Sequence, residues 1–299
     1  MKIGLVVPIA GTSESAPPRY AEIRRTAQQA ETLGFDSIWL FDHLLYRFDG
    51  QPTGIWEAWT MLAALAEATE RVELGTLVIC TAFRNPAVLA KMTDAVDEVS
   101  GGRLILGLGA GWHKPEFTAF GLPFDHLAGR FEEALEIITP LVRTGAVDFC
   151  GEYSQAPDCL NLPRGPRPDG PPILIASAGP RMLRLTARFA DSWNTAWLGA
   201  PDELPARRAK LDAACAEVDR DPKTLATTVG VIIALPDLGA DAAMAADPAK
   251  ALSGDAAALA EGFRAYASLD VAHVICDVFP RTSEAIARVA EAARMVRGI

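Results

Sequence analysis

The fold of this chain is decided by the stretch that begins VELGTLVI (residues 72–79) and ends RLILGL (residues 103–108). The first run is apolar and carries no charge after Glu73, a pattern that favours a strand buried on both faces. Between the two runs, Asn85-Pro86 is typical of a helix start and Gly101-Gly102 of a helix end. Strand, helix and strand in this order predict a parallel βαβ unit.

Outward from this unit, strand-like and helix-like segments alternate along the whole chain. A helix follows each of the predicted strands, which are 2–8, 37–41, 72–79, 103–108, 172–176, 192–196, 227–235 and 271–277. Eight such units without a central change of pattern favour a (β/α)8 TIM barrel over an open doubly wound sheet. We expect a single domain over 1–299, with an irregular excursion at 145–170.

Composition narrows the class of protein. The formal net charge of −10 argues against nucleic-acid binding, which needs a basic face. No apolar stretch approaches the roughly 20 residues that a membrane helix needs, and we expect no signal peptide. Five scattered cysteines without a Cys-x-x-Cys pair indicate reduced thiols in a cytoplasmic protein. The four histidines lack the spacing of a metal site, so no metal is expected.

The active site of such a barrel lies at the carboxyl ends of its strands. Asp42-His43 follows the second predicted strand, where a histidine suits proton transfer, although a packing histidine gives the same pattern. Gly109 and Gly111 follow the fourth strand and do not have the spacing of a dinucleotide fingerprint. They either let the backbone pass close to a flat ligand or allow close packing. Trp112 is a candidate wall of a ring-binding cleft.

A second candidate site follows the fifth predicted strand. Ser177-Ala178-Gly179 precedes a helix, and small residues there let backbone N–H groups and the positive helix end hold a phosphate. Arg181 or Arg281 is a candidate for the neutralising charge, and Asn194 lies at the end of the sixth strand. An ordinary turn with a helix cap would give the same local pattern.

Several of these stretches resemble the bacterial luciferase-like superfamily, and the resemblance covers most of the chain in the same order. It is carried by FDSIWLFDH (35–43), AEATERVELGT (66–76), SGGRLILGLGAGW (100–112) and ADSWN (190–194). The chain looks most like the branch that uses the deazaflavin coenzyme F420. The resemblance implies a TIM barrel that usually dimerises and transfers hydride between the deazaflavin and a small substrate. The other branch uses reduced FMN and oxygen, with a separate flavin reductase.

The resemblance also implies roles for individual residues. Asp42 and His43 match a catalytic pair beside the flavin ring, and Leu77-Val78 matches a non-proline cis peptide that supports the ring. Cys80 stands where a hydroxyl side chain is common, and Arg281 matches an arginine near the cofactor phosphate. The full set of expected cofactor contacts is Leu77, Val78, Cys80, Gly109, Gly111, Trp112, Ser177, Ala178, Gly179, Asn194 and Arg281.

At two positions the sequence departs from the pattern of the F420 branch, so FMN stays an alternative cofactor. Trp112 stands where the sugar-phosphate dehydrogenases of the F420 branch carry a catalytic glutamate, and the loop 197–200 lacks their phosphate-binding lysine. We therefore expect an F420-dependent oxidoreductase, with an FMN-dependent two-component monooxygenase or a non-catalytic flavin-binding barrel as alternatives. A cofactor-free barrel isomerase or aldolase would need a lysine or a carboxylate pair at strand ends, and none is clear. The expected partners are a small-molecule substrate, bound by variable loops such as 44–54 and 145–170, and a second copy of the chain, without nucleic acid or membrane.

Overall fold

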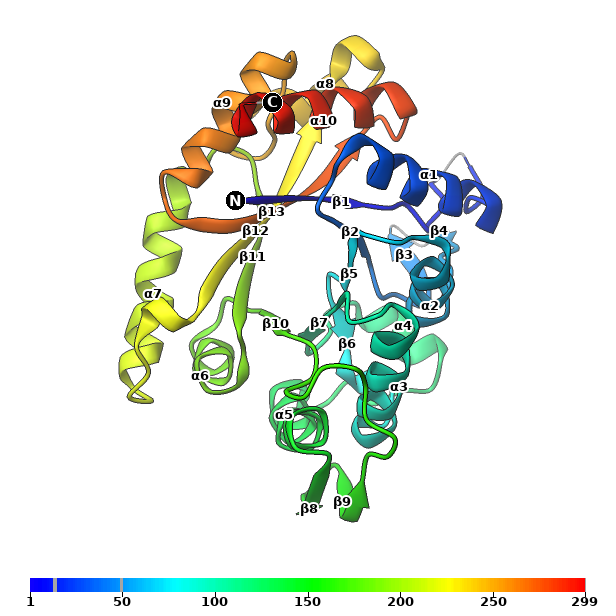
Figure 1. The fold of residues 1–299 in the computed structure, drawn as a ribbon, viewed down its shortest axis with the longest axis vertical. Coiled ribbons are helices and arrows are strands. Elements are labelled where there is room, and N and C mark those ends of the chain that lie inside the picture. The colour runs from blue at the N-terminus through cyan, green and yellow to red at the C-terminus, as the bar shows by residue number, and fades with distance from the viewer. Residues whose placement is uncertain (13–14, 49–50, 299) are drawn as a thin grey trace. The chain divides into compact units, whose positions relative to one another are not determined.

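The protein folds around a closed parallel sheet. The computed structural model describes residues 1–12, 15–48 and 51–298, so residues 49 and 50 of the predicted substrate loop lie outside it. The strands follow the order β10-β11-β12-β13-β1-β2-β5-β7, and β10 also pairs with β7. A sheet whose first and last strands pair is closed, so the predicted (β/α)8 barrel is confirmed and the open sheet is excluded (Figure 1).

The strands of the barrel lie close to their predicted positions. Their bounds are β1 Lys2–Val6, β2 Ser37–Leu40, β5 Glu73–Thr76, β6 Ile79–Cys80, β7 Leu104–Gly109, β10 Ile173–Ala176, β11 Ser192–Leu198, β12 Ala226–Ala234 and β13 Val271–Phe279. The helices that follow them are α1 Tyr20–Leu33, α2 Ala58–Ala68, α3 Pro86–Val99, α5 Leu127–Arg143, α6 Pro180–Phe189, α7 Leu204–Ala216, α9 Ala256–Ala267 and α10 Ser283–Arg297. Local signals set these bounds, since Asn85 caps α3 and Asp255 caps α9 with their side chains.

By its contacts the chain divides into two compact units, of which the first comprises 1–8, 22–39 and 176–299. A buried polar cluster lies between its strands β1, β2 and β13. Trp39 Nε1 donates to Ser37 Oγ at 2.7 Å, and Nε2 of His273 lies 2.8 Å from the same oxygen. A Cβ at Gly4 would lie 2.3 Å from Ser37 Oγ, so this cluster requires a glycine there.

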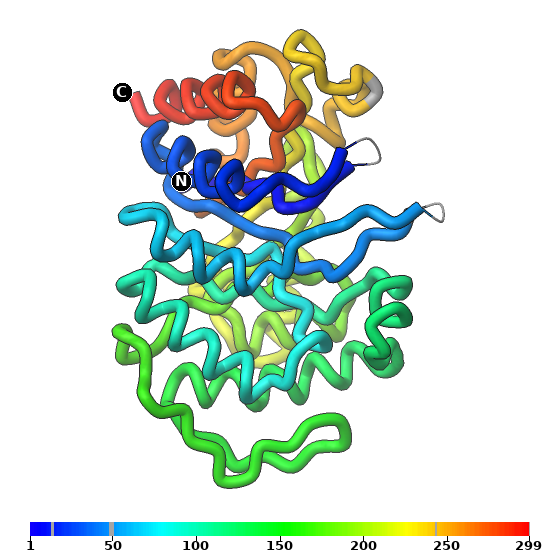
Figure 2. The backbone as a smooth tube through the Cα atoms, turned by 90° about the vertical axis from the view of Figure 1, so that its right-hand side faces the viewer, coloured from blue at the N-terminus to red at the C-terminus, as the bar shows by residue number. Residues whose placement is uncertain are grey.

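The second unit comprises 9–21 and 40–175 and holds β5, β6, β7 and β10. Its helices α2, α3 and α5 run side by side (Figure 2). Two hairpins were not predicted: β3 Tyr46–Phe48 pairs with β4 Gln51–Thr53, and β8 Ala146–Cys150 pairs with β9 Gln155–Leu160. The expectation of an irregular excursion at 145–170 is therefore wrong for its first part. The Glu133 carboxylate accepts the N–H groups of residues 152, 153 and 154, which fixes the turn of the second hairpin.

The third predicted strand, 72–79, is interrupted. It divides into β5 and β6, and between them the Leu77–Val78 peptide bond is cis, as the family resemblance predicts. A second non-proline cis bond, Ala196–Trp197, lies in β11 and was not predicted.

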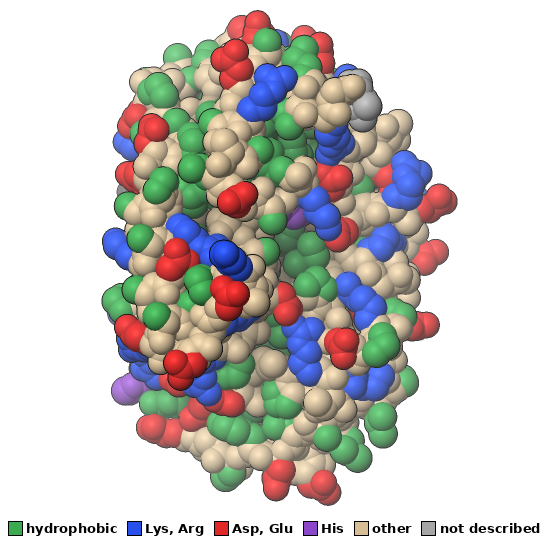
Figure 3. Space-filling view, turned by 60° about the vertical axis from the view of Figure 1, so that its left-hand side comes forward, with side chains coloured by type: hydrophobic (Ala, Val, Ile, Leu, Met, Phe, Trp, Pro, Cys, Tyr) green, Lys and Arg blue, Asp and Glu red, His purple; other side chains and the backbone are tan. Residues whose placement is uncertain are grey.

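The surface carries charged side chains of both signs. Lys and Arg side chains alternate with Asp and Glu side chains on the face shown in Figure 3. In the described part of the chain, no helix has the length and apolar character needed to span a membrane.

Candidate active site

In the second unit, predicted site residues converge where β2, β6 and β7 end. Together with Glu116 they line a small cavity of about 70 Å³. Its lining residues are Asp42, His43, Val78, Ile79, Cys80, Gly111, Trp112 and Glu116. The loops after three strands thus bring together residues that are up to 74 positions apart in the sequence, from Asp42 to Glu116.

Asp42 is buried and bound to Arg84. Its Oδ2 accepts from Arg84 Nη1 at 2.6 Å and from the Cys80 N–H at 2.9 Å, while Oδ1 accepts from Arg84 Nη2 at 2.9 Å. Burial raises the pKa of Asp42, and the Arg84 guanidinium offsets part of that rise. Arg84 also contacts Glu57, whose carboxylate caps α2. Asp42 therefore anchors the end of β6.

His43 has a different carboxylate partner. Its Nδ1 lies 2.9 Å from Oε1 of Glu116, while Oε2 accepts from the N–H groups of Leu44 at 2.8 Å and Leu45 at 3.4 Å. In the described part of the chain Asp42 makes no hydrogen bond to His43, and its carboxylate binds Arg84 and the Cys80 N–H instead. Among residues 1–12, 15–48 and 51–298, Nε2 of His43 has no hydrogen-bond partner.

Sequence reasoning missed Glu116 as a site residue. Glu116 lies in the short helix α4, Lys114–Ala119, which has no strong periodicity and was not predicted. The available signal was an acidic residue four positions after Trp112, in a loop that follows a barrel strand. Its side chain is 1% exposed, and a carboxylate this deeply buried needs several donors.

Aromatic rings surround the imidazole of His43. Tyr46 of β3 lies 4.5 Å from it and Trp112 lies 5.6 Å from it, centroid to centroid. His113 is buried, and its Nε2 accepts the N–H of Arg47 at 3.0 Å, which holds β3 against this cluster. Trp112 is 61% exposed. Two rings therefore lie against one side of His43, and a role of Trp112 in binding a ligand ring stays a prediction.

The glycines of β7 serve close packing. A Cβ at Gly109 would lie 2.6 Å from Val78 Cγ2, and one at Gly111 would lie 2.5 Å from Cys80 Sγ. Gly111 also has a φ of +87°, which favours glycine. Close packing against Val78 and Cys80 thus requires glycine at both positions, while their contact with a flavin ring stays a prediction. Burial raises the pKa of the Cys80 thiol to about 12, so it stays neutral.

The remaining predicted residues belong to the first unit. Gly179 is the N-cap of α6 and supplies no side-chain cap, and apart from its two chain neighbours no described atom lies within 4 Å of the place a Cβ would take. Beside it, Ser177 Oγ lies 2.7 Å from Thr186 Oγ1, and the Ser177 carbonyl accepts from Trp193 Nε1. The turn that contains Ala178 is thus fixed at both sides and has open space at Gly179.

Asn194 and Arg281 lie on other strands of the first unit. Asn194 Nδ2 donates to Thr228 Oγ1 at 2.9 Å, and its buried Oδ1 has no partner within the described part of the chain. Arg281 pairs with Asp277 at 3.5 Å. Burial raises the pKa of Asp277 to about 6, against the lowering influence of Arg281. The eighth strand was predicted to end at Asp277, whereas β13 continues to Phe279.

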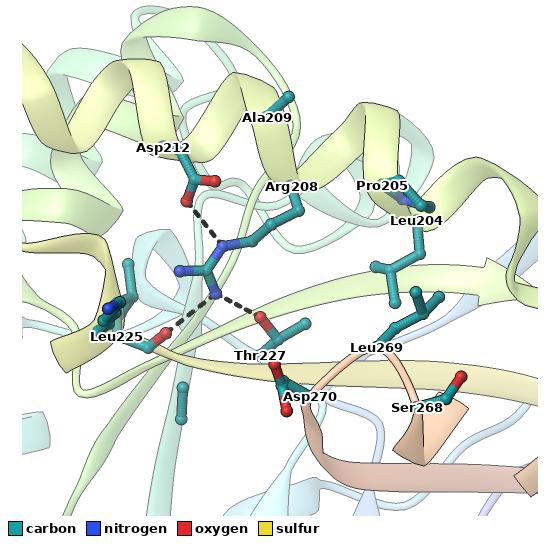
Figure 4. Close-up of a pocket in the computed structure, with 12 residues that line it drawn as sticks. Leu204, Pro205, Arg208, Ala209, Asp212, Leu225, Thr227, Ser268, Leu269 and Asp270 are labelled. Atoms are coloured by element: carbon teal, nitrogen blue, oxygen red, sulfur yellow. Dashed lines mark hydrogen bonds and ion pairs between the residues drawn. The ribbon is translucent and has the colours of Figure 1, made fainter. Parts of the chain in front are cut away.

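A larger cavity, about 710 Å³, lies in the first unit at the start of β12 (Figure 4). Arg208 of α7 points into it and donates to Asp212, to the Leu225 carbonyl and to Thr227 Oγ1. The guanidinium is thus engaged in holding α7 to the amino end of β12. This cavity contains none of the predicted site residues.

Comparison with known proteins identifies the relatives of the chain. The model of the family "luciferase-like monooxygenase" matches residues 1–296. Pyrimidine monooxygenase RutA is 31% identical in Stutzerimonas stutzeri, over 74% of this chain and 65% of that protein. In Methylobacterium radiotolerans it is 33% identical, over 82% of this chain and 67% of that protein. An F420-dependent glucose-6-phosphate dehydrogenase of Amycolatopsis mediterranei is 33% identical, over 61% of this chain and 54% of that protein.

Solved structures agree on the fold. An F420-dependent secondary alcohol dehydrogenase in complex with an F420-acetone adduct superposes with a TM-score of 0.81, at 20% identity over 99% of both chains. The monooxygenase RslO1 from Streptomyces bottropensis superposes with a TM-score of 0.80, at 22% identity over 100% of this chain and 99% of that one.

Proposed function

The chain belongs to the luciferase-like monooxygenase family, and on this premise we propose that it transfers a hydride between reduced coenzyme F420 and a small organic substrate. The observation that carries the proposal is the His43 imidazole at the end of β2, with Nδ1 bound to Glu116. Its Nε2 has no hydrogen-bond partner in the part of the chain that the structure describes. A positioned imidazole with one open nitrogen is suited to general acid–base catalysis near neutral pH.

His43 supplies the proton that accompanies the hydride. Hydride arrival at a carbonyl or imine carbon leaves negative charge on the oxygen or nitrogen, which a nearby acid neutralises. The reduced deazaflavin, when bound, supplies the hydride. Asp42 and Arg84 keep the end of β6 in place beside His43, and the rings of Tyr46 and Trp112 limit access of water on one side.

Two features of the chain support the proposed cofactor. The open space at Gly179, at the uncapped start of the ten-residue helix α6, suits a phosphate group, because helix N-termini present N–H donors to anions. Leu77, Val78 and Cys80 are our candidates for contact with the ring, since Val78 and Cys80 line the cavity with His43. Asn194 and Arg281 remain candidates for further contacts.

Reduced FMN with molecular oxygen is the second candidate. It is favoured by the pyrimidine monooxygenases, which match 74% and 82% of the chain, against 61% for the F420-dependent glucose-6-phosphate dehydrogenase. A flavin reductase would then be the expected partner.

Titration of the purified protein with F420 and with FMN, followed by cofactor fluorescence, tests the proposal. We expect saturable F420 binding and at least about tenfold weaker FMN binding, a difference of about 1.4 kcal/mol. The reverse order would replace the proposal by the second candidate. Failure of both cofactors to bind would contradict a flavin-dependent activity altogether.

A further inference from the structure

Glu116 uses both of its carboxylate oxygens on the loop that carries His43. Oε1 faces Nδ1 of His43 at 2.9 Å, and Oε2 accepts the N–H groups of the next two residues, Leu44 and Leu45. The side chain is 1% exposed, so water does not compete for these contacts. His43 and its acceptor are therefore held against each other by main-chain as well as side-chain bonds.

We propose that Glu116 is the positioning residue of this site, and that it fixes His43 as the tautomer with the proton on Nδ1. The proposal rests on the proposed function only for its catalytic consequence, which is that Nε2 exchanges the proton with the substrate. The tautomer itself follows from Glu116 and His43 alone. Neither the family match nor the relatives' names assign this role.

The tautomer follows from donor and acceptor chemistry. An ionised carboxylate only accepts hydrogen bonds, so the nitrogen that faces it has to donate. A neutral imidazole carries one N–H, and when this lies on Nδ1 the lone pair lies on Nε2. Asp42 does not fill this role, because in the described part of the chain its carboxylate binds Arg84 and the Cys80 N–H and makes no hydrogen bond to His43.

The proton balance of the step is then fixed. In the reducing direction a C–H bond forms from the hydride of the reduced cofactor, the C=O π bond breaks toward oxygen, and the oxygen takes the proton from Nε2. The cofactor is oxidised and the substrate is reduced, while His43 passes from imidazolium to the neutral Nδ1–H form. The Glu116 carboxylate accepts from Nδ1 in both forms of the ring, so the proton is exchanged at Nε2.

Nitrogen-15 spectra of the histidine rings in the cofactor-free protein test the tautomer. The chain has four histidines, so His43 is assigned by comparison with His43→Asn. We expect wild-type His43 to show a protonated Nδ1 and an unprotonated Nε2 once it is neutral. In Glu116→Gln, the side-chain carbonyl still accepts from Leu44 and Leu45, but the NH₂ group now faces Nδ1. We therefore expect the proton to move to Nε2.

Glu133→Gln is the matched control, because Glu133 also accepts backbone N–H groups of a loop but makes no hydrogen bond to a histidine in the described part of the chain. It should leave the His43 spectrum unchanged. Glu116→Asp, which keeps the carboxylate, should restore the Nδ1–H form at least in part. With a substrate in hand, Glu116→Gln should lower kcat by about 10- to 100-fold, with F420 affinity changed less than about twofold.

The outcomes separate the two proposals. A wild-type His43 with its proton on Nε2 overturns the role of Glu116 whether or not any variant folds, and leaves F420 binding untouched. An unchanged tautomer in a folded Glu116→Gln does the same. Failure of F420 to bind while the Nδ1–H form is observed contradicts the proposed function and leaves the positioning role intact.

Discussion

Two histidines of this chain occupy opposite kinds of surroundings. His273, in β13, is buried beside Trp39 and bound through Nε2 to Ser37, and burial lowers its pKa to about 3. His43, at the end of β2, has a carboxylate on one nitrogen and no partner among the described residues on the other. The difference teaches that the hydrogen-bond partners of a histidine, more than its burial, indicate whether its role is structural or in proton transfer. A histidine enclosed by hydroxyl and aromatic groups stabilises one neutral state, whereas one with a carboxylate and an open nitrogen is able to cycle its proton.

The largest expected effect is on kcat, and it tests the role of His43. His43→Ala should lower kcat by about 10² to 10⁴, because it removes the acid–base group, while cofactor affinity changes little. Pre-steady-state hydride transfer at saturating cofactor measures it. The control is His126→Asn, since His126 is exposed and has a φ of +50° that asparagine tolerates. Normal hydride transfer with weakened cofactor binding in His43→Ala would mean that His43 only packs.

The next effect is on the pH dependence of stability, and it tests the burial of His273. A base whose pKa falls from 6.5 to about 3 on folding contributes stability that is complete above pH 6.5 and is lost as the pH falls toward 3. At about 1.36 kcal/mol per pKa unit, unfolding should become easier by roughly 3 kcal/mol between pH 7 and pH 4.5 through His273 alone. Urea unfolding at the two pH values should show this slope reduced in His273→Gln and unchanged in His126→Asn. An equal slope in all three proteins would contradict the burial argument.

A feature could be predicted from the sequence when the residues that determine it lie close together along the chain. Helix caps such as Asn85 and Asp255 act within a few residues, so the barrel elements lie near their predicted bounds. The two hairpins were missed because their pairing depends on contacts such as that of Glu133 with residues 152–154. His43 was found by its place at a strand end. Its partner Glu116 was not, because 73 residues separate them and only the closed sheet fixes which loops meet.

Asp277 should change the pH dependence of stability in the opposite direction to His273. A carboxyl whose pKa rises from 3.8 to about 6 on folding contributes stability below pH 3.8 that is lost as the pH rises through 6. Asp277→Asn should therefore be more stable than the wild type at pH 7, by about 2 kcal/mol after allowing for the lost partner of Arg281. The gain should vanish near pH 4 in urea unfolding. Asp202→Asn, at an exposed position, is the control and should show no gain. A less stable Asp277→Asn at pH 7 would show that the pair with Arg281 outweighs burial.

The smallest expected effect is on cofactor affinity, and it tests the open space beside Gly179. Gly179→Leu should fill the volume at the start of α6 and raise the Kd for F420 about tenfold, or about 1.4 kcal/mol. Gly179→Ala should have a smaller effect in the same direction. Thermal unfolding should stay close to the wild type for both, since apart from the two chain neighbours no described atom lies within 4 Å of the new Cβ. Unchanged cofactor affinity in Gly179→Leu would remove this turn from the cofactor site.

Leu44 and Leu45 give Glu116 only their main-chain N–H groups. Every amino acid except proline supplies that group, so the acid–base pair places no demand on the side chains at these two positions. Laboratory evolution can therefore randomise residues 44 and 45 to seek new substrates while the main-chain bonds to Glu116 are kept.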